Sequence, residues 1–342
     1  MKIKYTVMAA LVGMGMVAVP PLASASSLKD KLDNIQVSGF VDTSYSGSNA
    51  TTPKTKGFGL DQVELDIEYH EGNVGLRFDL NASPSAGGNV TNDGLFEQGY
   101  ITYSVPGLPL LGEDGLTFTF GKFNAPIGWE LLDAPDMYQF SHALVFNFGL
   151  PTNLTGAMLS GSAGMLDASV YYTGGLDLNG TTAGGAKTFG GRLGITPVEG
   201  VNVGLSYIQD KNTNGVGAAA LKITDVDATI ELIENLLIGG EYNETKSMQG
   251  AGIKTRGFML MGHYDFTDMF GATVRYDNFD FDRATAGKST AYTGAVTAAL
   301  GGGLGALVEV RSDKNGAVTT DPNGTPPSRT VTSYAFEMTY GF

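Results

Sequence analysis

The sequence predicts an all-β fold, a single transmembrane antiparallel β-barrel of sixteen strands, with fourteen or eighteen strands as alternatives. Two observations carry the prediction: apolar and polar residues alternate along many short segments, and short connections alternate with long ones between those segments. A third is the ending, where Tyr334, Phe336, Met338, Tyr340 and Phe342 share one parity. Period two indicates a strand with one apolar and one polar face. A helical membrane protein is excluded, because no segment beyond the amino terminus approaches the ~20 apolar residues of a spanning helix.

The amino terminus has the features of a secretory signal peptide. Lys2 and Lys4 give a positive start, residues 7–19 form a short apolar run, and Ala23-Ser24-Ala25 resembles a cleavage site. The apolar run is too short to span a membrane as a helix. We therefore expect a signal peptide over residues 1–25, a short periplasmic segment over 26–34, and the barrel over 35–342.

Composition agrees with a barrel and excludes several kinds of site. The chain has 49 glycines, 10% aromatic residues and a mean hydropathy near zero, which a soluble β-sandwich could share. It has no cysteine, so disulfides, thiolate metal sites and covalently attached haem are excluded. The formal net charge of −14 argues against nucleic acid as a partner.

The alternation is clearest in two neighbouring segments. In residues 62–69, four apolar residues alternate with Gln62, Glu64, Asp66 and Glu68, and residues 74–81 alternate in the same way around Arg77 and Asp79. Such regular charges must face a polar interior. The segments around 154–161 and 288–300 are weaker and are placed by continuity. The alternation also slips after Tyr276, which suggests a bulge or a strand end.

The connections fall into two classes. Tight turns lie at 71–73, 163–164, 197–200, 234–235, 267–268 and 301–303, with a longer turn at 107–115. Longer links lie near 47–57, 82–94, 124–153, 174–187, 210–219, 245–255, 282–290 and 312–330. Strict alternation of this kind is typical of bacterial outer-membrane barrels, in which short turns face the periplasm and long loops face outward.

The ending and the tyrosines give the barrel its orientation. The terminal aromatic strand resembles the signal read by the outer-membrane assembly machinery, which would be a partner together with outer-membrane lipid and surface lipopolysaccharide. Interfacial aromatic residues form girdles at both rims of such barrels. We expect an external girdle of Tyr45, Tyr172, Tyr207, Tyr242, Tyr276 and Tyr292, and a periplasmic girdle of Tyr69, Tyr103, Tyr264, Tyr340 and Phe342. The alternative is that tyrosine simply favours strands.

The third long link, residues 124–152, is too apolar to lie in solvent, and long loops of this kind are usually functional. We predict that it folds into the lumen and narrows the pore. The candidate constriction residues are Trp129, Glu130, Asp133, Asp136 and His142. The alternative is a loop that caps the barrel or contacts a neighbouring protomer.

Strand parity also predicts the charges of the lumen wall. The candidate wall residues are Glu64, Asp66, Glu68, Arg77, Asp79, Arg192, Asp225, Asp227, Glu241, Arg275, Asp277, Glu309 and Arg311, with Asp42, Asp167, Asp265 and Glu337 as further inward acids. Acids outnumber arginines, and acidic pore walls favour cations. In the alternative reading, the wall acids pair with arginines across strands and only keep the lumen wet.

One block resembles a known family. Residues 121–130, Gly-Lys-Phe-Asn-Ala-Pro-Ile-Gly-Trp-Glu, followed by Ser141-His142, Phe146-Asn147-Phe148-Gly149-Leu150-Pro151 and Thr155-Gly156, resemble the central signature of the putative β-barrel porin-2 (OmpL-like) family. The resemblance implies an outer-membrane channel and names no solute. Family members often carry a basic residue near the signature serine, a position that His142 occupies here.

We therefore expect a passive porin, a water-filled diffusion channel for small hydrophilic solutes and ions with a modest cation preference and no cofactor. A homotrimer is one option by analogy with porins of this size. The alternatives are a plugged, structural or adhesive barrel and an outer-membrane hydrolase. The hydrolase is disfavoured because the only histidines are His70, His142 and His263 and no G-x-S-x-G occurs. Glu130, Asp133 and Asp136 lack the spacing of a calcium loop, so no metal site is predicted.

Overall fold

The computed structural model describes residues 32–50, 54–82, 95–105, 115–177, 187–211, 220–249, 252–281, 287–314 and 330–342. The predicted signal peptide and most of the predicted periplasmic segment lie outside the described residues. No helix among these residues is long and apolar enough to cross a membrane.

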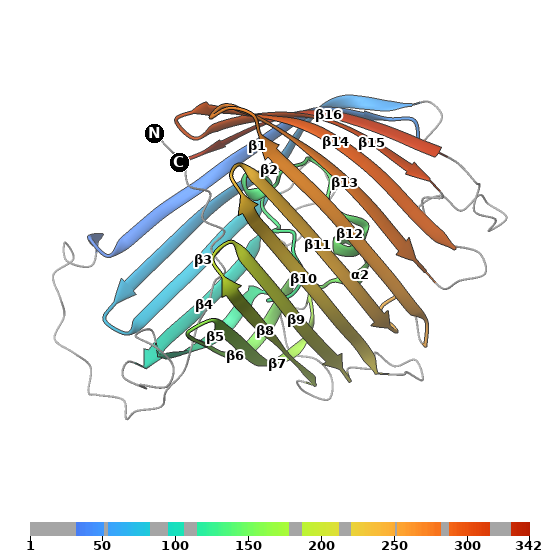
Figure 1. Cartoon of the computed structure of the whole chain (residues 1–342). Helices are drawn as coiled ribbons and strands as arrows, with labels where there is room; N and C mark the ends of the chain where they lie inside the picture. The colour runs from blue at the N-terminus through green and yellow to red at the C-terminus, as the bar shows by residue number, and fades with distance from the viewer. Residues whose placement is uncertain are drawn as a thin grey trace.

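The described chain forms a closed barrel of sixteen antiparallel strands (Figure 1), which confirms the predicted fold class and strand number. The strands are β1 (Ile35–Ser48), β2 (Thr55–Glu71), β3 (Val74–Ala82), β4 (Phe96–Val105), β5 (Leu116–Asn124), β6 (Asn153–Ala163), β7 (Leu166–Leu176), β8 (Thr188–Val198), β9 (Val201–Asp210), β10 (Leu221–Ile233), β11 (Leu236–Lys246), β12 (Lys254–Asp265), β13 (Phe270–Asp280), β14 (Lys288–Gly301), β15 (Leu304–Lys314) and β16 (Thr330–Gly341). Each strand pairs with its neighbours in sequence, and β1 pairs with β16 to close the ring.

Side chains alternate between the two faces of the wall as period two requires. On β13, Thr273, Arg275 and Asp277 are buried in the lumen, whereas Val274 between them is exposed on the outer face. Exposed apolar residues recur in the same way on the outer face of β15 and β16, for example Val308 and Phe336. A closed sheet with an apolar outer face is the arrangement that a β-barrel needs in lipid, because every central backbone group is paired within the wall.

The predicted break in the alternation after Tyr276 is wrong. β13 keeps its register with β12 up to the pair Arg256 and Asp280, with no bulge. Phe279 is instead an inward-facing side chain with no exposed surface. An apolar residue can face the lumen here because the third long loop covers it, as described below.

Bulges do occur on the opposite part of the wall. Opposite β1, the register shifts so that Asp61 of β2 is the extra residue, and opposite β3 the extra residue is Glu97 of β4. An inserted residue changes the facing of its neighbours. Glu97 and the adjacent Gln98 are therefore both buried in the lumen, although neighbouring residues of a regular strand face opposite sides.

Candidate functional site

The third long loop, residues 125–152 between β5 and β6, lies inside the barrel. It contains two short helical segments, η2 (Ala134–Asp136) and α2 (Leu144–Gly149). In Figure 1, α2 lies within the ring, behind β11 and β12, and it contacts the inner faces of β11, β12 and β13. The lumen is therefore narrowed by a segment of its own chain.

Trp129 fixes the start of this loop to β10 and β11. Its backbone N–H donates to Glu241 Oε2 at 2.8 Å, and its indole Nε1–H donates to Thr229 Oγ1 at 2.9 Å. The indole lies over the inward face of Gly239, where an added Cβ would come within 2.3 Å of the ring. Only glycine leaves room at Gly239 for this close approach.

The helix α2 packs into an apolar patch on the inner wall. Ala143 and Val145 have no exposed surface and pack in a cluster with Met259, Met261 and Phe279. The ring of Phe148 lies 5.7 Å from that of Phe279 and 5.1 Å from that of Phe281, between centroids. The side of the lumen lined by β11–β13 is thus filled by the loop.

Arg275 of β13 joins the loop to the wall by charge. Its Nη1–H donates to Glu130 Oε1 at 2.7 Å and to the carbonyl oxygen of Ser141 at 2.6 Å, and its Nε–H donates to Asp277 Oδ2 at 3.0 Å. The side chains of Arg275, Glu130 and Asp277 have no exposed surface. Burial raises the pKa of Glu130, while Arg275 and the N–H of Ala143, at 2.6 Å from Glu130 Oε2, stabilise its charged form. Glu130 therefore faces Arg275 and not the open lumen.

Arg311 of β15 makes a second anchor beside the first. Its Nη1–H donates to the carbonyl oxygen of His142 at 2.7 Å and to Ser141 Oγ at 3.1 Å, while the Ser141 N–H donates to Glu309 Oε2 at 3.0 Å. Both arginines are directed at the loop backbone. Their charges are consequently used to hold the loop.

His142 is held as a neutral ring at this junction. The ring stacks on Phe146 with centroids 4.0 Å apart, and Nε2 lies 2.9 Å from the carbonyl oxygen of Leu131, a contact that requires Nε2 to donate. Burial lowers the pKa of His142 to about 4, and the positive charges of Arg275 and Arg311 act in the same direction. No hydrogen bond joins Ser141 to His142 in the described chain, and the pair is not arranged as a nucleophile and its base.

The other edge of the loop faces a cavity of about 180 Å³. Its walls are Asp42, Asp61, Gln62 and Glu337 from β1, β2 and β16, and Leu132, Ala134, Met137, Gln139, Phe140 and His142 from the loop. No salt bridge reaches the three wall acids from any described residue. This side of the lumen is therefore acidic and open, in contrast to the filled side.

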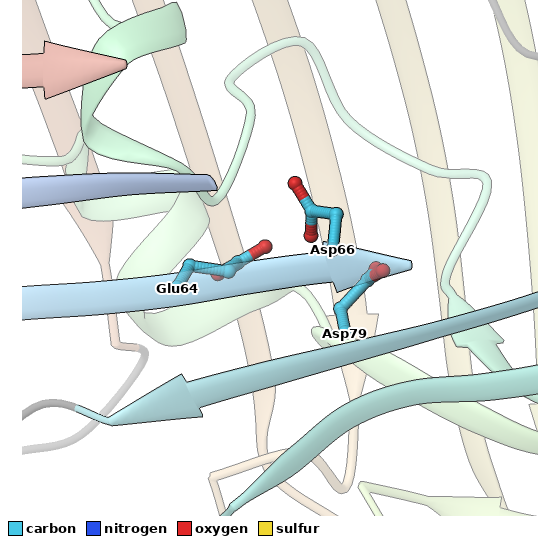
Figure 2. A group of neighbouring side chains, drawn as sticks. All are labelled: Glu64, Asp66 and Asp79. Carbon is cyan, nitrogen blue, oxygen red and sulfur yellow. The ribbon is translucent and has the colours of Figure 1, made fainter. Parts of the chain in front are cut away.

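A second group of acids lies next to Gln62 of this cavity, whose Nε2–H donates to Glu64 Oε2 at 3.4 Å. Glu64 and Asp66 of β2 and Asp79 of β3 point toward one another (Figure 2), each with a carboxylate oxygen within 4.8 Å of the others. Arg77 pairs with Glu68, Asp79 and Asp66 at 2.6, 2.9 and 3.7 Å, while Gln98 donates to Asp79.

The loop acids lie over this group. Asp133 accepts from Gln62 Nε2 at 3.4 Å. Burial, followed by the charges of Glu97 and Asp136, raises the pKa of Asp133 to about 8. Asp136 lies on η2, where partial desolvation within the barrel, followed by the charge of Asp66, raises its pKa.

The remaining predicted wall residues face the lumen in two groups. Arg192 pairs with Asp227 beside Asp225, and Glu241 accepts from Trp129 as described. His263 contacts Thr273 Oγ1 at 2.8 Å and Asp265 Oδ1 at 3.1 Å. The predicted girdle residues lie on the outer face, and Tyr45 contacts Phe58 and Tyr334 there.

Sequence reasoning missed three kinds of residue at this site. Asp61 and Glu97 enter the lumen through bulges, which break the parity on which the prediction depends. Phe279 and Phe281 face inward under α2. Two inward-facing glycines carried a usable signal, because Gly239 accommodates Trp129 and Gly257 accommodates Val145, whose Cγ1 would lie 2.5 Å from an added Cβ.

Comparison with known proteins agrees with this architecture. The sequence model of the family described as putative beta-barrel porin-2, OmpL-like, matches residues 34–342. Among solved structures, the anion-selective porin from Comamonas acidovorans is 15% identical, with 90% of this chain and 99% of that chain covered and a TM-score of 0.63. The outer membrane channel DcaP of Acinetobacter baumannii is 10% identical, with 90% and 97% covered and a TM-score of 0.64. The trimer form of OmpT from Vibrio cholerae is 12% identical, with 90% and 99% covered and a TM-score of 0.61. A search of curated proteins found no match.

Proposed function

Because the chain belongs to the putative beta-barrel porin-2, OmpL-like family of the bacterial outer membrane, we propose that it is a diffusion channel for small hydrophilic solutes and ions with a modest preference for cations. The single observation that carries the preference is the acidic cavity between the loop and β1, β2 and β16. Asp42, Asp61 and Glu337 line it without a basic partner in the described chain.

The arginines of the lumen do not offset these acids at the cavity. Arg275 and Arg311 are buried under the loop, and Arg192 pairs with Asp227. His142 borders the cavity as a neutral ring, since its pKa is lowered to about 4. A passage with acidic walls and no mobile positive charge concentrates cations. Trp129 and Glu130 hold the constricting loop against the filled side of the lumen, whereas Asp133 and Asp136 lie toward the acidic wall.

Two further assignments rest on the outer face and on the fold. Exposed tyrosines on the outer face support the proposed girdles in contact with lipid and lipopolysaccharide. A homotrimer is proposed because a structurally similar barrel has a described trimer form. Catalysis is not part of the proposal, since Ser141 and His142 are engaged in holding the loop.

Planar-bilayer recording of the purified barrel under a salt gradient tests the proposal. We expect a stable conductance and a reversal potential whose sign shows that the channel is more permeable to cations than to anions. The triple variant Asp42→Asn, Asp61→Asn, Glu337→Gln should move that potential toward zero. The double variant Glu231→Gln, Glu234→Gln is the matched control, because both acids are exposed near the β10–β11 turn, away from the cavity.

Three outcomes would contradict the proposal. Absence of conductance would favour a plugged or structural barrel. A reversal potential on the anion side would overturn the charge argument. An unchanged potential in the triple variant would place the selective residues elsewhere.

A further inference from the structure

A group of buried carboxylates joins the loop to the wall at β2 and β4. Glu64, Glu97 and Asp133 each place a carboxylate oxygen within 4.8 Å of the other two. Glu64 is 3% exposed and Glu97 is 6% exposed. Since the three residues come from two strands and the loop, the group exists only when the loop is seated.

No arginine or lysine of the described residues makes a salt bridge with this group, although the charge of Lys122 acts on Glu97. Arg77 on the intervening strand β3 pairs with Asp66, Glu68 and Asp79, and no salt bridge reaches Glu64, Glu97 or Asp133. Lys122 on β5 directs its ammonium to the carbonyl oxygen of Phe96 at 2.7 Å. The side chains that do hydrogen-bond to the group are neutral amides. Three carboxylates held this close in a partly desolvated site require a counter-charge.

A buried oxygen of Glu97 is also available to accept a further ligand. Asn81 Nδ2 donates to Glu64 Oε2 at 2.6 Å and to Glu97 Oε2 at 2.5 Å, but Glu97 Oε1 is buried and accepts no hydrogen bond. The amide oxygen of Asn81 is also buried without a partner. Buried polar atoms are almost always satisfied, so such orphaned acceptors indicate a bound cation or water. The β4 bulge places Glu97 here, where a regular strand would turn it outward.

We propose that Glu64, Glu97 and Asp133 bind a divalent cation of the calcium class, which ties the loop to the wall. Calcium takes six to eight oxygen ligands in flexible geometry, so water molecules would complete the coordination by the three carboxylates. Zinc and copper are disfavoured because the group contains no histidine or cysteine. Asp66 and Asp79, which Figure 2 shows beside Glu64, are already paired with Arg77.

The proposal goes beyond channel function, because the barrel could conduct with or without a bound cation. On the filled side of the lumen, arginines connect the loop to buried acids. On the acidic side, the cation has the same role, since without it Asp133 lies against carboxylates that repel it. Calcium binding would therefore fix the edge of the loop that borders the passage.

Isothermal titration calorimetry tests the site directly. The full-length barrel, refolded in detergent without lipopolysaccharide and treated with a chelator, is titrated with calcium chloride at pH 8. We expect one saturable site per chain and weaker binding of magnesium, which demands a stricter octahedral geometry. Glu97→Gln and Asp133→Asn should each weaken calcium binding by at least about tenfold. Asp265→Asn is the matched control, a partly exposed wall acid on β12.

The outcomes are distinguishable even if a strand variant folds poorly. Asp133 lies in the loop outside the strands, so its variant should retain the barrel, as checked by the heat-dependent mobility of the folded form on gels. No saturable calcium binding by the wild type would overturn the proposal and leave a shared proton as the counter-charge. Binding that is equally tight in Asp133→Asn and in wild type would overturn the location. Equal affinity for magnesium would overturn the calcium assignment.

Discussion

The two edges of the inward loop meet opposite kinds of wall. Along β11–β13 the loop covers an apolar patch, and each buried acid that it touches there has an arginine or a backbone N–H as its partner. Along β1, β2 and β4 it faces acids such as Asp42, Glu64 and Glu97, which make no salt bridge within the described residues, while Arg77 pairs with Glu68 and Asp79 beside them. One edge therefore seats the loop, and the other borders a cavity with acidic walls. The two edges differ because Arg275 and Arg311 bind the loop itself on one side, whereas Arg77 on the other side pairs with acids of its own wall.

Removing the arginine of the filled side should have the largest effect. Arg275→Ala leaves Glu130 and Asp277 buried without their cation, which costs about 3–5 kcal/mol. The loop should leave the wall, so that single-channel conductance rises and the emission of Trp129, the only tryptophan of the chain, shifts to longer wavelength.

The control for this variant is Arg256→Ala. Arg256 pairs with Glu244 at 2.8 Å, but its side chain is 60% exposed, and exposed pairs contribute ~1 kcal/mol or less. Equal effects of the two variants would mean that Arg275 does not hold the loop.

Removing the apolar contact should be nearly as damaging. Phe279→Ala opens a cavity beneath Phe148 and Val145, and we expect a loss of about 3 kcal/mol in loop seating, measured by denaturant titration of Trp129 emission. Phe336→Ala removes the same side chain from the outer face and should leave the emission unchanged.

Filling the space under Trp129 should have a moderate effect. An added methyl at Gly239 overlaps the indole, so Gly239→Ala should weaken seating of the loop by about 1–3 kcal/mol. Gly262→Ala on β12 is the matched control, since nothing lies within 4 Å of its added Cβ. A normal emission spectrum in Gly239→Ala would show that the indole has another place to pack.

The smallest effect should be a dependence on pH through His142. Its folded pKa is lowered to about 4, whereas the unfolded side chain titrates near 6.5. Below about pH 6.5 His142 binds a proton when the loop is released, whereas in the seated loop it binds one only at about pH 4. The seated state should therefore be destabilised progressively as pH falls through this window.

Comparison of denaturation curves for wild type and His142→Gln between pH 7 and pH 4 measures this loss as a difference. His70→Gln, near the end of β2 with 62% of its side chain accessible, is the control and should follow the wild type. A difference that does not grow as pH falls would show that the released and seated rings titrate alike.

The strands of the barrel wall could be predicted from the sequence, but the contacts across the lumen could not. Alternation and connection length predicted the strands, and the weak segments proved to be β6 and β14, because period two holds even in runs of glycine and alanine. Asp61 and Glu97 escaped because a bulge shifts the alternation by one residue, so the parity of the rest of the strand assigns the inserted residue to the wrong face. The pairing of Arg275 with Glu130 joins residues far apart in sequence, and only the closed ring brings them together. The inward glycines at 239 and 257 could have been used for prediction, since a position without a side chain on the lumen face indicates that another residue fills the space.

The pairing of β1 with β16 has a consequence for how the barrel is made. It pairs Phe40 with Gly341 and Ser48 with Ser333, so the first and the last strand of the sequence must come together before the ring closes. Before the ring closes, the free edges of β1 and β16 carry unpaired backbone groups. Hydrocarbon cannot satisfy these groups, and they can pair with other chains. An unfinished sheet therefore cannot rest stably in the bilayer. Ring closure should be late, slow and cooperative, and the waiting chain needs protection from aggregation until its last strand arrives.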